Sequence, residues 1–323
     1  MQRRFASESA LVFIAGSALA AVLPPFYAGL VTLTGLYALV TLGLNLFMGY
    51  AGQVSLGQAA FFGVGAYTSA VLALKYGITP WLGAVVGAFF AALLAYGISF
   101  VTLRLRENYL ALATLALGIV VSVVFAQWDY VGGTSGLVGI PPFTLFGRPF
   151  DQRAYAVLTW ILVAAGVWFA NNLVTSTYGR ALIALASGEL GSLALGLDAD
   201  RLRRQVFMLS AVYAGIGGAI YASYVSYIDP TSFTFLLSVN FVLMSVIGGL
   251  RSVWGAIVGA AAVVALGQFL SIYVPALIPN ARGDFQTFFF GIILIAILVN
   301  LPDGLISGLT RIRRSRAAPV RPE

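Results

Sequence analysis

The chain alternates long apolar runs with short polar or charged connections, in a pattern that predicts ten transmembrane helices. A helix needs about 20 mainly apolar residues to cross the hydrocarbon core of a bilayer. Span edges read in this way are uncertain by about two to four residues. The predicted spans are 1–23, 26–48, one ending near 74, 81–103, 109–128, 154–170, 206–227, 233–247, 256–274 and 285–299.

The first run allows two interpretations. It begins with Arg3 and Arg4, and an apolar stretch follows that ends at Pro24 and Pro25. A basic start before an apolar run is also typical of a signal peptide. Because further spans follow immediately, we favour a first transmembrane helix.

A glycine-rich stretch, GYAGQVSLGQAAFFGVGAY at residues 49–67, departs from the lipid-facing pattern. Polar segments interrupted by glycine inside membrane proteins are often broken or re-entrant helices that line a cavity. Small residues also permit close helix crossings, and the two interpretations are compatible. By position, the candidates for a translocation path are Asn45, Gln53, Ser55 and Gln58. The alternative role for each is a hydrogen bond between helices.

Residues 178–207 form a charged insert between apolar spans. Its apolar positions recur at gaps of three to five, roughly as on one helix face. We expect this face to contact another protein; the alternative is an ordinary amphipathic helix at the membrane surface. Gly196 can end the helix, Asp198 and Asp200 begin the next turn, and the basic residues that follow lie at the lipid headgroups. The apolar positions are Leu182, Leu185, Leu190, Leu193 and Leu197.

Composition supports a membrane protein. The 323 residues are 60% hydrophobic and 9% charged, whereas soluble proteins carry about 25% charged residues. The absence of cysteine and histidine excludes disulfides, thiolate nucleophiles and most zinc or haem sites. The predicted fold class is therefore an all-α polytopic membrane protein.

The basic residues predict an orientation. With ten spans and both termini in the cytoplasm, all but four of the 18 Lys and Arg residues fall on the cytoplasmic side, as the positive-inside rule expects. The four exceptions are Lys75, Arg148, Arg153 and Arg282. The charged insert and a basic tail at 310–323 then both face the cytoplasm.

Several function classes lose support. The interiors of the predicted spans carry no evident carboxylate or lysine, which disfavours a proton-coupled transporter. The chain has no GxxxxGK[ST] motif for nucleotide phosphates and no evident nucleophile–base pair. No basic face with interleaved aromatics stands clear of the spans, so nucleic acid is not an expected partner. What remains is a pore-forming or transporting subunit rather than an enzyme.

Five stretches together resemble the membrane permease subunits of ABC importers for branched-chain amino acids, specifically the M-type subunit. They cover nearly the whole chain in the family's order. They are residues 44–70 (LNLFMGYAGQVSLGQAAFFGVGAYTSA), 103–118 (LRLRENYLALATLALG), 132–141 (GGTSGLVGIP), 178–197 (YGRALIALASGELGSLALGL) and 210–259.

The resemblance implies a single permease domain over 1–323 in the inner membrane, surrounded by lipid. It also implies an H-type permease partner, two cytoplasmic ATP-binding subunits and a periplasmic substrate-binding protein. ATP and Mg²⁺ are expected on the ATPase subunits, and no cofactor on this chain. The segment 172–205 corresponds to the coupling segment that contacts the ATPases. The residues it assigns there are Arg180, Glu189, Leu190, Leu193, Gly196 and Leu197.

Two departures from the family's pattern are visible. Gly191 and Ser192 stand where the family tends to have an alanine pair, and Gln58 stands where it often has histidine. The expected substrates are leucine, isoleucine and valine. The alternatives are urea or short amides, an ion-coupled secondary transporter, and a membrane scaffold that transports nothing.

Overall fold

The computed structural model describes residues 9, 12–18, 24–103, 107–187, 198–277, 283–300 and 304–306. Within them, eight helical segments are long and apolar enough to cross a membrane. These segments are α2 (Pro25–Asn45) with its π-helical end η1 (Leu46–Tyr50), α3 (Gln58–Tyr76), α4 (Pro80–Thr102), α5 (Glu107–Gln127), α6 (Gln152–Thr175), α9 (Ala199–Val225), α10 (Phe235–Gly248) with the preceding turn η4 (Pro230–Phe233), and α11 (Val253–Leu277).

The all-α polytopic fold is thereby confirmed, and eight of the predicted spans appear as helices. The tenth is also helical, as α12 (Gly283–Asn300), although its apolar part, Thr287–Asn300, is shorter than a full span. Of the first predicted span, residues 12–18 are described and helical, and most of the rest lies outside the described residues.

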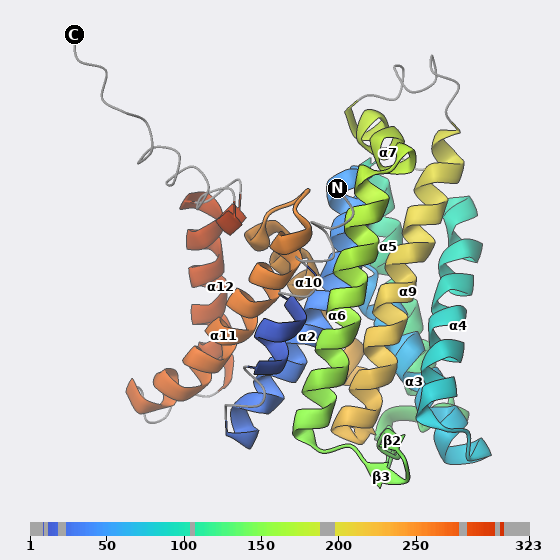
Figure 1. Ribbon diagram of the computed structural model, residues 1–323, viewed down its shortest axis with the longest axis vertical. Coiled ribbons are helices and arrows are strands. Elements are labelled where there is room, and N and C mark those ends of the chain that lie inside the picture. Colours follow the sequence, from blue (N-terminus) through green and yellow to red (C-terminus); the bar gives the residue numbers. More distant parts are fainter. Residues whose placement is uncertain are drawn as a thin grey trace.

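The helices pack around two central elements. Helix α9 contacts α3 and α4 extensively, whereas α2 contacts α6, α9, α10 and α11. Figure 1 shows these helices as an upright bundle, with α11 and α12 at one side and α4 at the other. Residues far apart in the sequence therefore meet along α2 and α9.

Glycines permit the closest of these crossings. A Cβ on Gly65 of α3 would overlap the backbone carbonyl of Gly215 on α9. A Cβ on Gly87 of α4 would lie 2.8 Å from the carbonyl oxygen of Gly65. The close-crossing interpretation of the glycine-rich stretch is confirmed, because no larger side chain leaves room for these backbones to approach.

The two ends of the bundle carry different structures. One end bears α7 (Thr177–Ser187), and the opposite end bears a short hairpin of β2 (Thr144–Leu145) and β3 (Arg148–Pro149) (Figure 1). The 3₁₀ turns η2 (Asp129–Val131) and η3 (Gly133–Ser135) follow α5, and β1 (Leu137–Val138) pairs antiparallel with β4 (Tyr227–Ile228). The glycine-rich connection after α5 is thus loop and short irregular structure.

The seventh predicted span begins earlier than expected. Helix α9 starts at Ala199 rather than near 206, because the carboxylate of Asp198 caps it by accepting the backbone N–H of Arg201 at 3.0 Å. The helix therefore carries three basic residues of the insert, Arg201, Arg203 and Arg204, on its first turns. The guanidinium of Arg204 lies 4.1 Å from the ring centroid of Phe100 on α4, a cation–π contact.

Candidate functional site: the break between α2 and α3

The glycine-rich stretch interrupts the helical path between α2 and α3. Helix α2 ends in the π-helical turn η1, residues 51–57 are not helical, and α3 begins at Gln58. Gly52 has a φ of +68°, in the left-handed region that glycine adopts without strain. The glycine-rich stretch therefore contains a non-helical connection between two segments that are each long enough to be a span.

The break is mostly buried, apart from Val54, and other helices satisfy part of the backbone at the start of α3. The N–H of Leu56 donates to Thr114 Oγ1 on α5 at 2.9 Å, and the N–H of Ala59 donates to Ser238 Oγ on α10 at the same distance. Non-helical backbone at membrane depth is tolerated only where protein or water supplies such partners. Hydroxyl groups from two separate helices therefore hold the start of α3 in place.

Gln58 ties the start of α3 to α9. Its Nε2 donates to the carbonyl oxygen and to Oγ of Ser210, both at 3.1 Å, and the side chain is 1% exposed. Ser55 is fully buried and its Oγ accepts the N–H of Gly57 at 3.4 Å. Gln53 is also buried, and its backbone N–H donates to the carbonyl of Phe47.

Asn45 joins this break to a second one, the connection 249–252 between α10 and α11. Its Nδ2 donates to the carbonyls of Gly249 at 3.3 Å and Ser252 at 2.8 Å, while Oδ1 accepts the N–H of Arg251 at 3.2 Å. Arg251 has a φ of +64° and donates through Nε to the carbonyl of Gly49 at 2.9 Å. The hydroxyl of Tyr50 donates to the carbonyl of Arg251 at 2.6 Å.

The structure thus places all four predicted path residues at or beside the break, buried within the bundle. Asn45 and Gln58 make the hydrogen bonds between distant segments that the alternative interpretation proposed. Their contact with a translocated substrate stays a prediction.

Helix α7 packs onto the same break. A Cβ on Gly52 would lie 3.2 Å from Cβ of Ala186, near the end of α7. Tyr178 donates its hydroxyl to the carbonyl of Leu202 on α9 at 3.2 Å, and burial raises the pKa of Tyr178 to about 12. The helix is therefore attached both to the break and to the start of α9.

The expectation that the whole apolar face of the insert contacts another protein is wrong for its first two leucines. Leu182 and Leu185 are 1% and 3% exposed, and Leu182 belongs to the core of this chain. The apolar face of α7 turns inward because the break and α9 offer it a surface in the same chain.

One of the predicted ATPase-contacting residues lies in the described part of the chain. Arg180 is exposed on α7, and its Nη1 lies 3.5 Å from the carbonyl of Thr175. The others, Glu189, Leu190, Leu193, Gly196 and Leu197, lie outside the described residues, and their role stays a prediction.

Three residues that complete the site do not stand out in the sequence pattern: Thr114, Ser210 and Ser238. Each is buried and is one of two serine or threonine residues in its helix. A serine or threonine in a span gives little signal, because it can also bond its own helix, as Thr114 does with the carbonyl of Ala111. The described residues contain no cluster of three or more acidic side chains that could bind a metal ion.

Comparison with known proteins identifies the family. Residues 26–298 match the family model described as "Branched-chain amino acid transport system / permease component". The high-affinity branched-chain amino acid transport system permease protein LivM of Escherichia coli K12 is 28% identical over 300 residues, covering 85% of this chain and 68% of LivM. A probable LivM of Methanocaldococcus jannaschii is 28% identical over 235 residues, covering 70% of this chain and 65% of that protein.

Another relative, matched over a shorter part of this chain, has a different named cargo. The autoinducer 2 import system permease protein LsrC of Escherichia coli O9:H4 is 29% identical over 225 residues, covering 68% of this chain and 60% of LsrC. No solved structure matched the chain. Since the family model covers all eight described candidate spans and both helix breaks, the chain belongs to the family of permease components of branched-chain amino acid transport systems.

Proposed function

We propose that this chain is the membrane-spanning permease subunit of an ATP-driven importer that moves leucine, isoleucine and valine into the cytoplasm. The observation that carries the proposal is the family match over residues 26–298, which includes both helix breaks. The LivM relatives are also named as permease proteins of branched-chain amino acid transport systems, and they match most of this chain.

The structure suggests how such a subunit responds to its partners. ATP hydrolysis on other chains can act on the spans only through a contact, and α7 leads into the segment 188–197 that we assign to that contact. Because α7 packs on Gly52 and on the start of α9, its displacement would act directly on the break. Asn45 would pass the displacement on to the connection between α10 and α11.

The proposal includes specific partners and a location. The partners are an H-type permease subunit, two cytoplasmic ATP-binding subunits and a periplasmic substrate-binding protein. ATP and Mg²⁺ bind the ATP-binding subunits, and this chain carries neither ATPase activity nor a cofactor of its own. The chain is a multi-pass membrane protein, and we place it in the inner membrane.

The alternatives are less well supported. Neither the family description nor the relatives named above concern urea or amides. The described candidate spans before α9 contain no carboxylate in their interiors, and Lys75 lies near a helix end. The absence of an ionisable group inside these spans disfavours an ion-coupled secondary transporter.

Uptake of radiolabelled leucine into proteoliposomes tests the proposal. The chain is reconstituted with its candidate permease partner, ATPases and binding protein, and compared with a double variant, Glu189→Ala with Leu193→Asp. We expect uptake that requires both ATP and the binding protein, and that is lost in the double variant as the ATPases dissociate.

Two results would change the conclusion. ATP-independent uptake by this chain alone would overturn the importer mechanism in favour of a secondary transporter. ATP-driven flux of urea or an amide without flux of leucine would retain the mechanism and replace the substrate.

A further inference from the structure

A cavity of about 350 Å³ lies between α3, α4, α5 and the turn η2, on the outer side of the bundle and separate from the break. Its inner wall is buried: Tyr67 stacks on Phe125, with ring centroids 4.1 Å apart. Its outer wall is exposed, with Tyr76 at 63%, Trp128 at 55% and Phe90 at 46%. The cavity therefore opens away from the bundle, toward the lipid that surrounds a membrane protein.

The lining of the cavity matches an acyl chain along its length. Val64, Val71 and Leu72 of α3 contribute one wall, and Phe90 and Phe125 face them from the neighbouring helices. Val64 and Tyr76 are 12 positions apart on α3, which corresponds to about 18 Å of helix. One leaflet of hydrocarbon is about 15 Å thick. The cavity thus spans about one leaflet.

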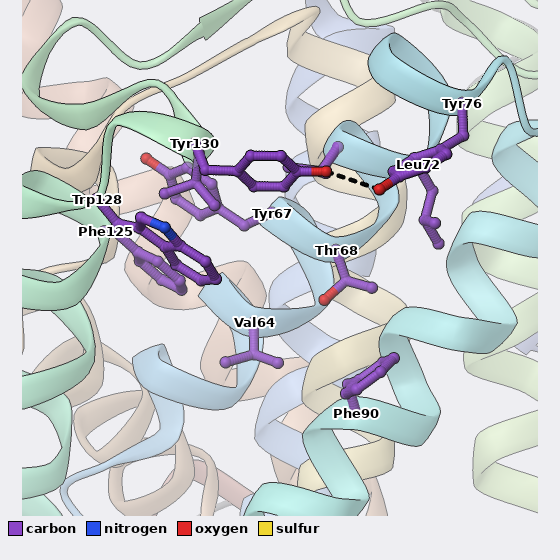
Figure 2. A pocket seen from close by; sticks show the side chains of 11 residues that line it. Val64, Tyr67, Thr68, Leu72, Tyr76, Phe90, Phe125, Trp128 and Tyr130 are labelled. Atoms are coloured by element: carbon purple, nitrogen blue, oxygen red, sulfur yellow. Dashed lines mark hydrogen bonds between the residues drawn. The ribbon is translucent and has the colours of Figure 1, made fainter.

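One end of the cavity is built for a headgroup. Figure 2 shows Tyr76 and Tyr130 meeting across this end, with their hydroxyl oxygens 2.8 Å apart, and Val64 and Phe90 further along. Tyr76 ends α3, and Trp128 and Tyr130 follow the end of α5. Tyrosine and tryptophan at helix ends mark the level of the headgroups.

A cation stands at the same end. Lys75 Nζ donates to the carbonyl of Tyr130 at 2.6 Å and lies 3.6 Å from the centroid of the Tyr130 ring. An ammonium has three N–H donors, so one bond to this carbonyl leaves donors for a phosphate. The cation and the hydroxyl groups thus lie at one end of the cavity and the apolar lining extends away from them. This is the order of the polar headgroup and the acyl chain in a phospholipid.

We propose that this cavity binds an anionic glycerophospholipid, with one acyl chain between α3, α4 and α5 and the phosphate at Lys75. The site belongs to the leaflet on the side of the β2–β3 hairpin. The inference requires only that the chain spans a membrane, so it is independent of the transported substrate.

A second cavity of about 280 Å³ provides an internal comparison. It is lined by Trp81, Phe143 and aliphatic side chains, and its lining includes no tyrosine, lysine or arginine. An acyl chain can enter it, but the lining offers no charge to select a headgroup. The two cavities therefore differ in the feature on which the proposal depends.

Quenching of tryptophan fluorescence by lipids with brominated acyl chains tests the proposal. The full-length chain, in detergent micelles with any subunits that accompany it, is titrated with brominated phosphatidylglycerol or brominated phosphatidylethanolamine. The fluorescence of Trp128 is obtained by subtracting the fluorescence of the Trp128→Phe variant from that of wild type. The fluorescence of Trp81 is obtained in the same way, from a Trp81→Phe variant. We expect saturable quenching of Trp128 at a several-fold lower mole fraction of phosphatidylglycerol, and no headgroup preference at Trp81.

Three variants complete the experiment. Lys75→Ala should abolish the headgroup preference at Trp128. Val71→Trp should fill the cavity and so remove binding, which is measured as retention of phosphatidylglycerol in native mass spectrometry. Arg148→Ala, a cation of the β3 strand at the same end of the bundle, should leave the preference unchanged. Elution as a single species in size-exclusion chromatography shows that each variant is folded.

Equal quenching by both lipids, or a preference that survives Lys75→Ala, would overturn the proposal, because the contact would then be bulk lipid only. Absence of quenching at Trp128 by either lipid would also overturn it, since another subunit would then cover this face.

Discussion

Asn45 is the side chain that joins the two interruptions in the helical bundle. Its amide uses both donor hydrogens and its oxygen to pair three backbone groups of the connection between α10 and α11. A side-chain amide offers two donor hydrogens and an acceptor oxygen on one group, which no single backbone group does. Position 45 therefore depends on the amide itself and not only on a polar side chain.

Replacement of Asn45 by alanine should destabilise the protein. The carbonyls of Gly249 and Ser252 and the N–H of Arg251 would lose their partner, and each unpaired buried group costs about 1–3 kcal/mol. We expect a lower midpoint of thermal unfolding and reduced uptake. Asn300→Ala is the matched control, because Asn300 is exposed and bonds only within its own helix, to the carbonyl of Ala296. Equal stability of the two variants would contradict the role of Asn45.

Asp229 lies just before the candidate span that begins at Pro230, and its side chain caps the turn η4 by accepting the N–H of Ser232 at 3.0 Å. Partial burial raises its pKa, but hydrogen bonds from Ser232 and Thr231 outweigh that effect and hold the pKa below its ordinary value of 3.8. Because the pKa is lower in the folded state, the carboxylate stabilises the fold above the unfolded pKa, and this contribution is lost as the pH falls through the folded value.

Substitution Asp229→Ser should remove this pH dependence. Serine retains a cap oxygen but does not titrate, so stability at pH 7 should fall by less than the roughly 1 kcal/mol typical of a lost cap. Thermal unfolding is measured from pH 7 to below pH 3.8. The difference between wild type and variant should shrink as the pH falls, and a difference that stays constant would contradict the assignment.

At the scale of elements, α7 is attached to the break it is proposed to move. The attachment is close because Gly52 lacks a side chain where α7 passes. Gly52 and Gly77 both have a φ in the left-handed region, +68° and +63°, but nothing lies within 4 Å of a Cβ on Gly77. The same substitution at these two glycines therefore distinguishes the effect of backbone strain from the effect of contact with α7.

Valine at position 52 should therefore impair uptake more than valine at position 77. Both variants incur the strain of a left-handed residue, about 1–2 kcal/mol. Only Gly52→Val also meets Ala186 and displaces α7. We expect several-fold lower ATP-driven leucine uptake for Gly52→Val than for Gly77→Val at equal amounts of folded complex. Equal uptake by the two variants would show that contact between α7 and the break does not carry the coupling.

At the scale of the whole molecule, the bundle separates α7 from the β2–β3 hairpin by the length of its helices (Figure 1). The basic residues predict that the α7 end faces the cytoplasm. The chain contains no cysteine, so single introduced thiols report the side of the membrane without background.

A membrane-impermeant maleimide tests this orientation. Phe146→Cys at the hairpin tip, where the side chain is 97% exposed, should react in right-side-out vesicles. Arg180→Cys on α7 should react only in inside-out vesicles or after permeabilisation. The reverse pattern would invert the orientation, and reaction of both from one side would contradict a bundle with α7 and the hairpin on opposite faces.

The sequence by itself determined the class of protein and most of its spans. Hydrocarbon requires long apolar helices and excludes charge, so both requirements are visible residue by residue along the chain. The glycine-rich stretch also marked the break between α2 and α3, because glycine and glutamine are unusual on a lipid-facing helix.

Only the tertiary structure decided what the break contacts. Asn45 meets Gly249 across 204 positions, and Leu182 and Leu185 turn into the bundle rather than toward a partner. Apolar helices have similar surfaces, so a local pattern does not determine which of them pack together. That choice depends on where small residues let backbones approach and where a distant hydroxyl or amide satisfies an interrupted helix.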